Sequence, residues 1–170
     1  MHSLKLIFQS ILLLSFTSVL LLSCGGGGAD DKSSDATDAS AKPDAAQVVK
    51  LEIAGNDAMQ FNKKELKAKA GSKVELTLKH NGSMNAQVMG HNVVILKQGV
   101  NAAEFCQKAA AASSNGYIPE GSDEYIVHTK MIGGGEETTV TFNAPEKGTY
   151  DFVCSFPGHF ALMQGKFIVM

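Results

Sequence analysis

The chain has 170 residues, of which 44% are hydrophobic and 19% are charged, so it can form one folded domain with residues to spare. Its basic residues are all lysines, and the net charge of -2 provides no basic surface of the kind that follows a phosphate backbone, which excludes nucleic acid as an expected partner. Three cysteines are too few for a domain held together by disulfides.

The N-terminus is typical of a secretion signal. Lys5 precedes an apolar run over residues 6–22, and the run ends in Leu21-Leu22-Ser23-Cys24. A short apolar segment behind a positive charge predicts a signal peptide, here over residues 1–23. The ending resembles a bacterial lipobox, which implies cleavage before Cys24 and lipid on its thiol. An ordinary signal peptide or a membrane anchor is the alternative.

Residues 24–46 are predicted to form a flexible tether behind the lipidated cysteine. Four glycines follow Cys24, and the rest of the segment contains five aspartates and two lysines among small residues. Such a composition cannot bury enough apolar surface to fold. We therefore expect a folded domain over 47–170 that its lipid holds at a membrane of the cell envelope, facing the periplasm.

From Val49 the chain alternates apolar and polar residues, which is the pattern of strands with one buried face. In the run near the C-terminus, Tyr150, Phe152 and Cys154 share one face and Val153 lies on the opposite one. Turn-forming residues separate the strands, and seven or eight strands predict an all-β sandwich. The alanine-rich residues 102–112 predict one short helical insertion. The alternating runs lie at 49–53, 73–79, 139–142 and 150–154.

The last third of the chain carries three soft metal ligands close together. Cys154 ends a strand, a Pro157-Gly158 turn follows, and His159 and Met163 come next. A thiolate, an imidazole and a thioether together select copper over magnesium, calcium or manganese. A type 1 copper site needs a second histidine, and His91 supplies it at the start of an apolar run. Each of these residues alone would more often be structural, but together they predict one type 1 copper ion.

Several segments resemble the azurins, small blue copper proteins of the cupredoxin family. The likeness extends over about residues 49–169, and the spacing Cys-x4-His-x3-Met is the azurin spacing. The resemblance implies a Greek-key β-sandwich in which His91, Cys154 and His159 are equatorial ligands. Met163 and the carbonyl of Gly90 would be long axial contacts. The segments that carry the likeness are 55–57, 59–61, 89–92, 126–130 and 154–163.

The resemblance also implies roles around the metal. Asn92 would form hydrogen bonds near the Cys154 sulfur and tie the two ligand segments together. His80 and His128 match histidines that are not ligands, and we expect both to be structural. An apolar patch around the exposed edge of His159 would admit electrons, although core filling is the alternative for its methionines. The members of this electron-entry patch are Met59, Met84, Met89, Phe156, Pro157, Ala161 and Leu162.

The chain departs from the azurin pattern in ways that concern its stability and location. Azurins usually carry a disulfide near the N-terminus, and the matching positions here are Val49 and Ser72. Cys106 lies in the helical insertion without a partner, either buried or as a free reactive thiol, and we favour a buried one. Phe160 is larger than the residue usual after the ligand histidine, and a lipid tether is unusual in the family.

The ligand set predicts an electron carrier and not an enzyme. We expect no open coordination position for a substrate, and five histidines are too few for the second metal site of a nitrite reductase fragment. The predicted function is electron transfer on the periplasmic side, with one copper cycling between Cu(I) and Cu(II). We expect a monomer whose donor and acceptor are redox proteins such as cytochromes or a terminal reductase or oxidase. A copper storage or delivery module is the alternative.

Overall fold

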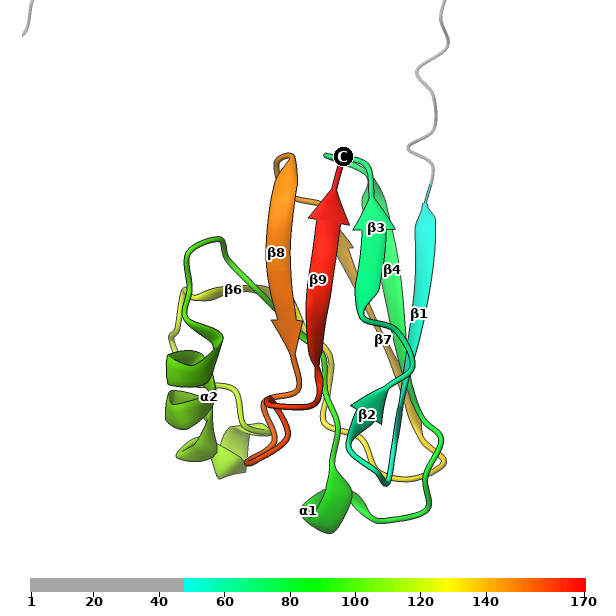
Figure 1. The fold of residues 1–170 in the computed structure, drawn as a ribbon, viewed down its shortest axis with the longest axis vertical. Helices are drawn as coiled ribbons and strands as arrows, with labels where there is room; N and C mark the ends of the chain where they lie inside the picture. Colours follow the sequence, from blue (N-terminus) through cyan, green and yellow to red (C-terminus); the bar gives the residue numbers. More distant parts are fainter. Residues whose placement is uncertain (1–47) are drawn as a thin grey trace, which may run out of the picture. The chain divides into compact units, whose positions relative to one another are not determined.

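A computed structural model describes residues 48–170, which form two β-sheets packed face to face (Figure 1). The predicted signal peptide, the tether and its Cys24 lie outside the described residues. Within 48–170, no helix is both long enough and apolar enough to cross a membrane.

The first sheet has the strand order β2-β1-β4-β7. Strands β1 (Val49–Asn56) and β4 (Lys73–His80) run parallel, with Val49 opposite Val74 and Gly55 opposite His80. The short β2 (Gln60–Phe61) and the longer β7 (Glu137–Asn143) pair antiparallel at the two edges. Because β1 and β4 point the same way, the segments that leave them emerge at the same end of the sandwich.

The second sheet has the order β3-β9-β8-β5-β6. Its strands, all antiparallel except for the β3–β9 pair, confirm the predicted all-β sandwich. The described residues contain nine strands and not the expected seven or eight, because strands as short as β2 leave too little alternation to detect. The members are β3 (Glu65–Ala68), β5 (Val94–Leu96), β6 (Tyr125–His128), β8 (Gly148–Val153) and β9 (Gln164–Val169).

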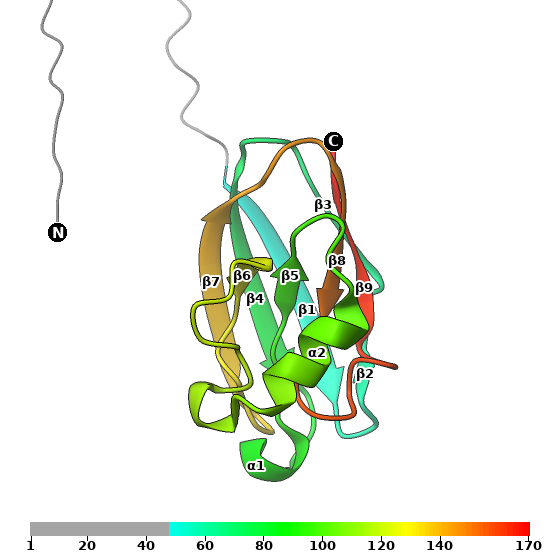
Figure 2. The same cartoon turned by 90° about the vertical axis from the view of Figure 1, so that its left-hand side faces the viewer.

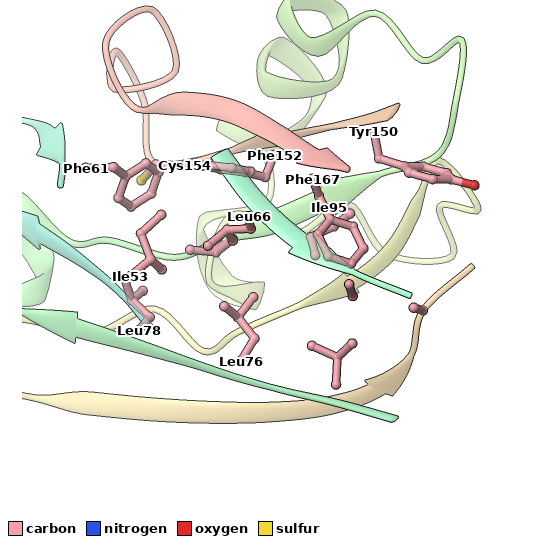
Figure 3. Packing of buried hydrophobic residues seen from close by; sticks show 14 of the residues in the cluster. Ile53, Phe61, Leu66, Leu76, Leu78, Ile95, Tyr150, Phe152, Cys154 and Phe167 are labelled. Atoms are coloured by element: carbon pink, nitrogen blue, oxygen red, sulfur yellow. The ribbon is translucent and has the colours of Figure 1, made fainter. Parts of the chain in front are cut away.

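The core lies between the two sheets and includes a metal-ligand candidate. Ile53 and Leu76 from the first sheet and Phe152 and Phe167 from the second are fully buried there (Figure 3). Burying each such side chain contributes about 1.5–3 kcal/mol of transfer free energy. Cys154, one residue beyond β8, belongs to the same cluster and has no exposed surface. Strand β8 thus places the Cys154 thiol at a position in the core that solvent does not reach.

Helix α2 (Ala102–Ala110) covers the outer face of the second sheet (Figure 2). Phe105 and Cys106 pack there in a cluster with Val153, which is fully buried. The expectation that the outer face of this strand meets water is therefore wrong for Val153, because the helix covers it. The predicted short helix is confirmed, although it ends at Ala110 and not at residue 112. Both cysteines of the described part are free thiols, and the buried position favoured for Cys106 is confirmed. That burial raises the pKa of Cys106 to about 12.

Two further helical turns lie in the connections. Helix α1 (Ala86–Met89) is capped at its N-terminus by Asn85, whose side-chain oxygen accepts hydrogen bonds from the N–H groups of Gln87 and Val88. A 3-10 turn (Ser113–Asn115) follows α2. Helix α1, the β1–β2 turn and the β8–β9 connection lie at the same end of the sandwich (Figure 1). The predicted metal ligands are carried by segments at this end.

Candidate metal centre

The ligand loop, residues 154–163, is closed on itself by backbone hydrogen bonds. The Cys154 N–H donates to the Met163 carbonyl at 2.9 Å, and the Met163 N–H donates to the His159 carbonyl at 2.8 Å. Gly158 takes a left-handed φ of 84°, which a glycine adopts without strain. The closed loop holds Cys154, His159 and Met163 in fixed relative positions.

His91 reaches the ligand loop from a distant part of the chain. It follows α1, and its N–H and carbonyl exchange hydrogen bonds with Ile132 at 3.0 and 2.9 Å. The donor atoms of His91, Cys154 and His159 all lie within 4.8 Å of one another. In the part of the chain that the structure describes, this is the one such group of three or more His, Cys, Asp or Glu residues.

The distances fit a single metal ion. The Cys154 Sγ lies 3.7 Å from His159 Nδ1 and 3.9 Å from the Gly90 carbonyl oxygen. Metal–sulfur and metal–nitrogen bonds of about 2.3 and 2.0 Å, as found for zinc, separate the two donor atoms by about 3.7 Å at a trigonal angle. A thiolate with two imidazoles and a thioether is the donor set that blue copper uses.

The polar contacts of the His91 ring also fit a cation beside its Nδ1. Its Nε2 lies 2.9 Å from the Asn56 carbonyl oxygen, and its Nδ1 lies 2.9 Å from the Gly90 carbonyl oxygen. A neutral imidazole has only one N–H, so one of these contacts joins a lone pair to a lone pair. Burial lowers the pKa of His91, which disfavours the doubly protonated ring. If Nε2 holds the proton, Nδ1 and the Gly90 carbonyl are two acceptors turned toward the same place, as a cation requires.

Burial keeps the side chains of His91, Cys154 and His159 uncharged in the metal-free protein. It raises the pKa of the Cys154 thiol to about 11, although the backbone N–H groups of Asn92 and Phe156 oppose this shift. Burial, with smaller contributions from the neighbouring His91 and His80, lowers the pKa of His159 to about 4. At neutral pH the imidazoles are therefore ready to bind a metal, whereas the thiol must first lose its proton.

Asn92 joins the His91 segment to the ligand loop through Ser155. Its side-chain N–H donates to the Ser155 hydroxyl oxygen at 2.8 Å, and its side-chain oxygen accepts from the Ser155 N–H at 2.8 Å. Both residues have no exposed surface. These bonds join the two ligand segments beside Cys154, and the backbone N–H of Asn92 also acts on the Cys154 thiol.

Met163 is fully buried and packs beside His91 against Gly55. A Cβ on Gly55 would lie 2.6 Å from His91 Cδ2 and 3.1 Å from Met163 Cε. The absence of a side chain at Gly55 therefore lets both ligands approach the end of β1. Neither Gly55 nor the Asn56 carbonyl was identified from the sequence, because a backbone atom that contacts a residue 35 positions away leaves no local pattern.

The segments with the electron-entry patch lie at the same end of the sandwich as the ligands (Figure 1). Met84 and Leu162 are 43% and 51% exposed, so they are surface residues and do not fill the core. Val88 on α1, which is not among the predicted patch members, is 59% exposed, and a single valine in a four-residue helix shows no periodicity that would predict this. His159 itself is only 3% exposed. Of the remaining members, Pro157 and Ala161 are exposed, and Met59, Met89 and Phe156 are half-buried.

The other two histidines of the described part have hydrogen-bond partners of their own. His80 Nδ1 accepts from the Gly82 N–H at 3.0 Å, so its Nε2 carries the proton and donates to the Met89 carbonyl at 2.8 Å. Its ring stacks on His91, with centroids 4.2 Å apart. His128 is half-buried, and its Nδ1 lies 3.0 Å from the Thr129 carbonyl oxygen. These contacts accord with structural roles for both.

Residues 47–170 match the family described as copper-binding proteins of the plastocyanin/azurin family. Azurin-1 of Alcaligenes xylosoxydans xylosoxydans is 44% identical over 119 residues, which cover 68% of this chain and 92% of that protein. Outer membrane protein H.8 of Neisseria gonorrhoeae is 42% identical over 118 residues, covering 67% of this chain and 63% of its own. A reduced auracyanin from Roseiflexus castenholzii superposes with a TM-score of 0.66 at 34% identity, over 72% of this chain and 97% of its own. With the geometry above, these matches confirm a type 1 copper site of His91, Cys154, His159 and Met163.

Copper binding should release about one proton at pH 7.5. The Cys154 thiol, with a pKa of about 11, is protonated there, whereas His159, with a pKa of about 4, and His91, whose pKa burial lowers below its usual range, are not. The apparent Cu(II) affinity should therefore rise about tenfold per pH unit above this value. A pH indicator in weakly buffered solution measures the release. Release of two or three protons would contradict the neutral imidazoles, and release of none would contradict thiolate binding.

Gly55→Ala should damage the site. The new methyl group would meet the His91 ring, which cannot move away because it is buried and bonded to Asn56. We expect the free energy of unfolding to fall by about 1–3 kcal/mol and Cu(II) affinity to fall about tenfold or more. Gly148→Ala is the control, because the three atoms nearest to its methyl group would all belong to the exposed side chain of Gln98, which can move into solvent. Equal copper affinity in both variants would show that Gly55 does not limit the site.

Proposed function

The chain belongs to the plastocyanin/azurin family of copper-binding proteins, and from this premise we propose that it carries electrons between redox proteins on the periplasmic side of a membrane. Members of the azurin group are electron carriers and not enzymes, and this chain shares their copper site. The proposal adds the location, the lipid anchor and the surface through which electrons enter.

The burial of the ligands carries the proposal. Bound copper supplies a one-electron couple between Cu(II) and Cu(I). His91, Cys154 and Met163 have no exposed surface, and each is fixed by hydrogen bonds or close packing to the sandwich. Side chains held in this way keep their positions when the charge of the site changes, and they exclude water from it. Little movement per electron is what a carrier needs.

The same burial disfavours copper storage or delivery. A delivery protein passes its ion to an acceptor, whose ligands must reach the metal while the first set still holds it. Here His159 is the ligand nearest to solvent among the three metal-binding His and Cys side chains, and it is only 3% exposed. Handover of copper would require the ligand loop to open, whereas handover of an electron does not.

Electrons enter through the patch around His159. The Phe156 ring lies 4.5 Å from the His159 ring, between centroids, and exposed Pro157, Ala161 and Leu162 belong to the same loop. An apolar partner surface on this patch would displace water and shorten the distance to the metal ligands. The domain over 47–170 contains 12 lysines and 12 acidic residues, so docking depends on apolar contact and little on long-range charge.

The location rests on the N-terminal sequence and on one relative. Cys24 follows an apolar signal with a lipobox-like ending, and a glycine-rich tether connects it to the domain. A relative of 42% identity is named an outer membrane protein. Both observations support a lipid-anchored protein in the cell envelope that reaches its redox partners from a membrane surface.

Leu162→Lys should slow electron self-exchange of the copper-loaded protein about tenfold or more. Two molecules that dock patch to patch would bring two new like charges into a water-excluding contact, which costs several kcal/mol. The reduction potential should change little, because Leu162 is 51% exposed and a lysine there can extend into water. NMR line broadening in mixtures of the oxidised and reduced protein measures the rate, and voltammetry measures the potential.

Thr141→Lys is the control for this experiment. It adds the same charge to an exposed position of β7 opposite Glu75, away from the ligand loop, and it should leave self-exchange unchanged. Equal slowing in the two variants would show that electrons do not enter at the patch. A copper-loaded protein without a reversible one-electron couple would contradict the carrier function itself.

Cys24→Ser should abolish lipid attachment. The mature native protein should require detergent for extraction, and mass spectrometry of its N-terminal peptide should show a diacylglycerol-modified cysteine. The serine variant should lack this mass. Lipid found on the serine variant, or an unmodified Cys24 in the native protein, would exclude the lipobox interpretation.

A further inference from the structure

Tyr117 has a backbone conformation that a bulky residue rarely adopts. Its φ is 61°, in the left-handed region, and Gly116 before it has the same φ. Such conformations persist in non-glycine residues only where the surroundings fix them, and they concentrate at functional sites. In the connection from the 3-10 turn to β6, a glycine would satisfy the backbone at residue 117 without strain.

The surrounding loop holds this conformation from both sides. The Tyr117 N–H donates to the Ala112 carbonyl at 2.9 Å, and the Ile118 N–H donates to the Asn115 carbonyl at 3.2 Å. The side chain of Asn115 in turn donates to the Ile118 carbonyl at 2.8 Å. Ile118 is 3% exposed and packs in the cluster beneath α2. The Tyr117 carbonyl therefore has a fixed direction.

That carbonyl accepts a hydrogen bond from the residue next to the thiol ligand. The Ser155 hydroxyl donates to it at 2.7 Å and accepts from the Asn92 side chain at 2.8 Å. Ser155 has no exposed surface, so no water can replace either partner. The hydrogen bond to the Tyr117 carbonyl thus fixes the orientation of the Ser155 hydroxyl. In this orientation the hydroxyl oxygen can accept the hydrogen bond from the Asn92 side chain.

The ring of Tyr117 contacts the ligand loop at a second place. It packs edge to face on Phe156, with centroids 5.1 Å apart and planes at 62°. Phe156 in turn lies against His159, with centroids 4.5 Å apart. The Tyr117 carbonyl therefore contacts Ser155, the residue after Cys154, and the Tyr117 ring contacts Phe156, which packs on His159.

We propose that Tyr117 is a positioning residue of the copper site, which holds Cys154 in place through Ser155 and His159 in place through Phe156. Its carbonyl makes the first contact and its ring makes the second. The role concerns how firmly the ligand loop holds copper, so it does not depend on the proposed electron partners or on the membrane location.

The test compares Tyr117→Leu with Tyr125→Leu in the full-length copper-loaded protein. Both tyrosines are half-buried and both pack edge to face on a phenylalanine, but Tyr125 contacts Phe105 beneath α2 and not the ligand loop. Both variants should lower the midpoint of thermal unfolding of the metal-free protein. Tyr117→Leu should also release Cu(II) to excess chelator about tenfold faster or more, whereas Tyr125→Leu should stay within about twofold of the native rate.

Three further variants separate the two contacts. Tyr117→Phe keeps the ring and should keep the native release rate. Tyr117→Gly keeps the left-handed backbone without strain but lacks the ring, so it should release copper as fast as Tyr117→Leu, and it replaces that variant if the leucine protein does not fold. Ser155→Ala removes the donor to the Tyr117 carbonyl together with the acceptor of the Asn92 side chain, and it should also speed release about tenfold or more.

Equal release rates for Tyr117→Leu and Tyr125→Leu would overturn the proposal, and so would a native rate in Tyr117→Gly or in Ser155→Ala. Chelator-driven release involves no electron transfer. A failure here is therefore distinct from a failure of the carrier function, which self-exchange and voltammetry report.

Discussion

Two hydrogen bonds between Asn92 and Ser155, buried beyond the reach of water, join the two chain segments that carry the metal ligands. An unmet polar group at such a depth costs about 1–3 kcal/mol, so the bonds form together or the segments separate. One segment arrives from α1 and carries His91, and the other continues from β8 and carries Cys154. The position of His159 and Met163 then follows from the backbone bonds that close the ligand loop.

Burial has a second consequence, which is electrostatic. The water-free pocket that fixes the ligands also disfavours every charged form, so it holds the thiol protonated and the imidazoles neutral until a cation arrives. A bound cation would neutralise part of the thiolate charge. It would also remove the repulsion between the lone pairs of His91 Nδ1 and the Gly90 carbonyl oxygen, which lie 2.9 Å apart. The metal therefore completes a polar cluster that the protein alone leaves incomplete. The exposed surface beside it remains apolar, which suits brief contacts with redox partners.

Much of this could be predicted from the sequence, because the decisive residues are close together in it. Cys154, His159 and Met163 lie within one loop, and alternation before Cys154 showed that the thiol points into the core. The outer face of β8 could not be predicted, since α2 covers Val153 through a contact between distant segments. The same holds for Gly55, whose missing side chain leaves room for the distant His91, and for Tyr117, whose carbonyl and ring contact the distant ligand loop. Local sequence patterns indicate which side chains can bind a metal. Which backbone groups and distant side chains they contact depends on long-range packing, which these patterns do not show.

The visible spectrum of the protein loaded with Cu(II) tests the central claim most directly. A buried thiolate bound to copper with two imidazoles and a thioether should give an intense blue charge-transfer band. Cys154→Ser should abolish the band, and Met163→Leu should retain it, because a thioether is a weak copper ligand and is not needed for the thiolate–copper bond. A native protein that binds one Cu(II) tightly and stays colourless would contradict the assignment of Cys154, His91, His159 and Met163 as a type 1 site.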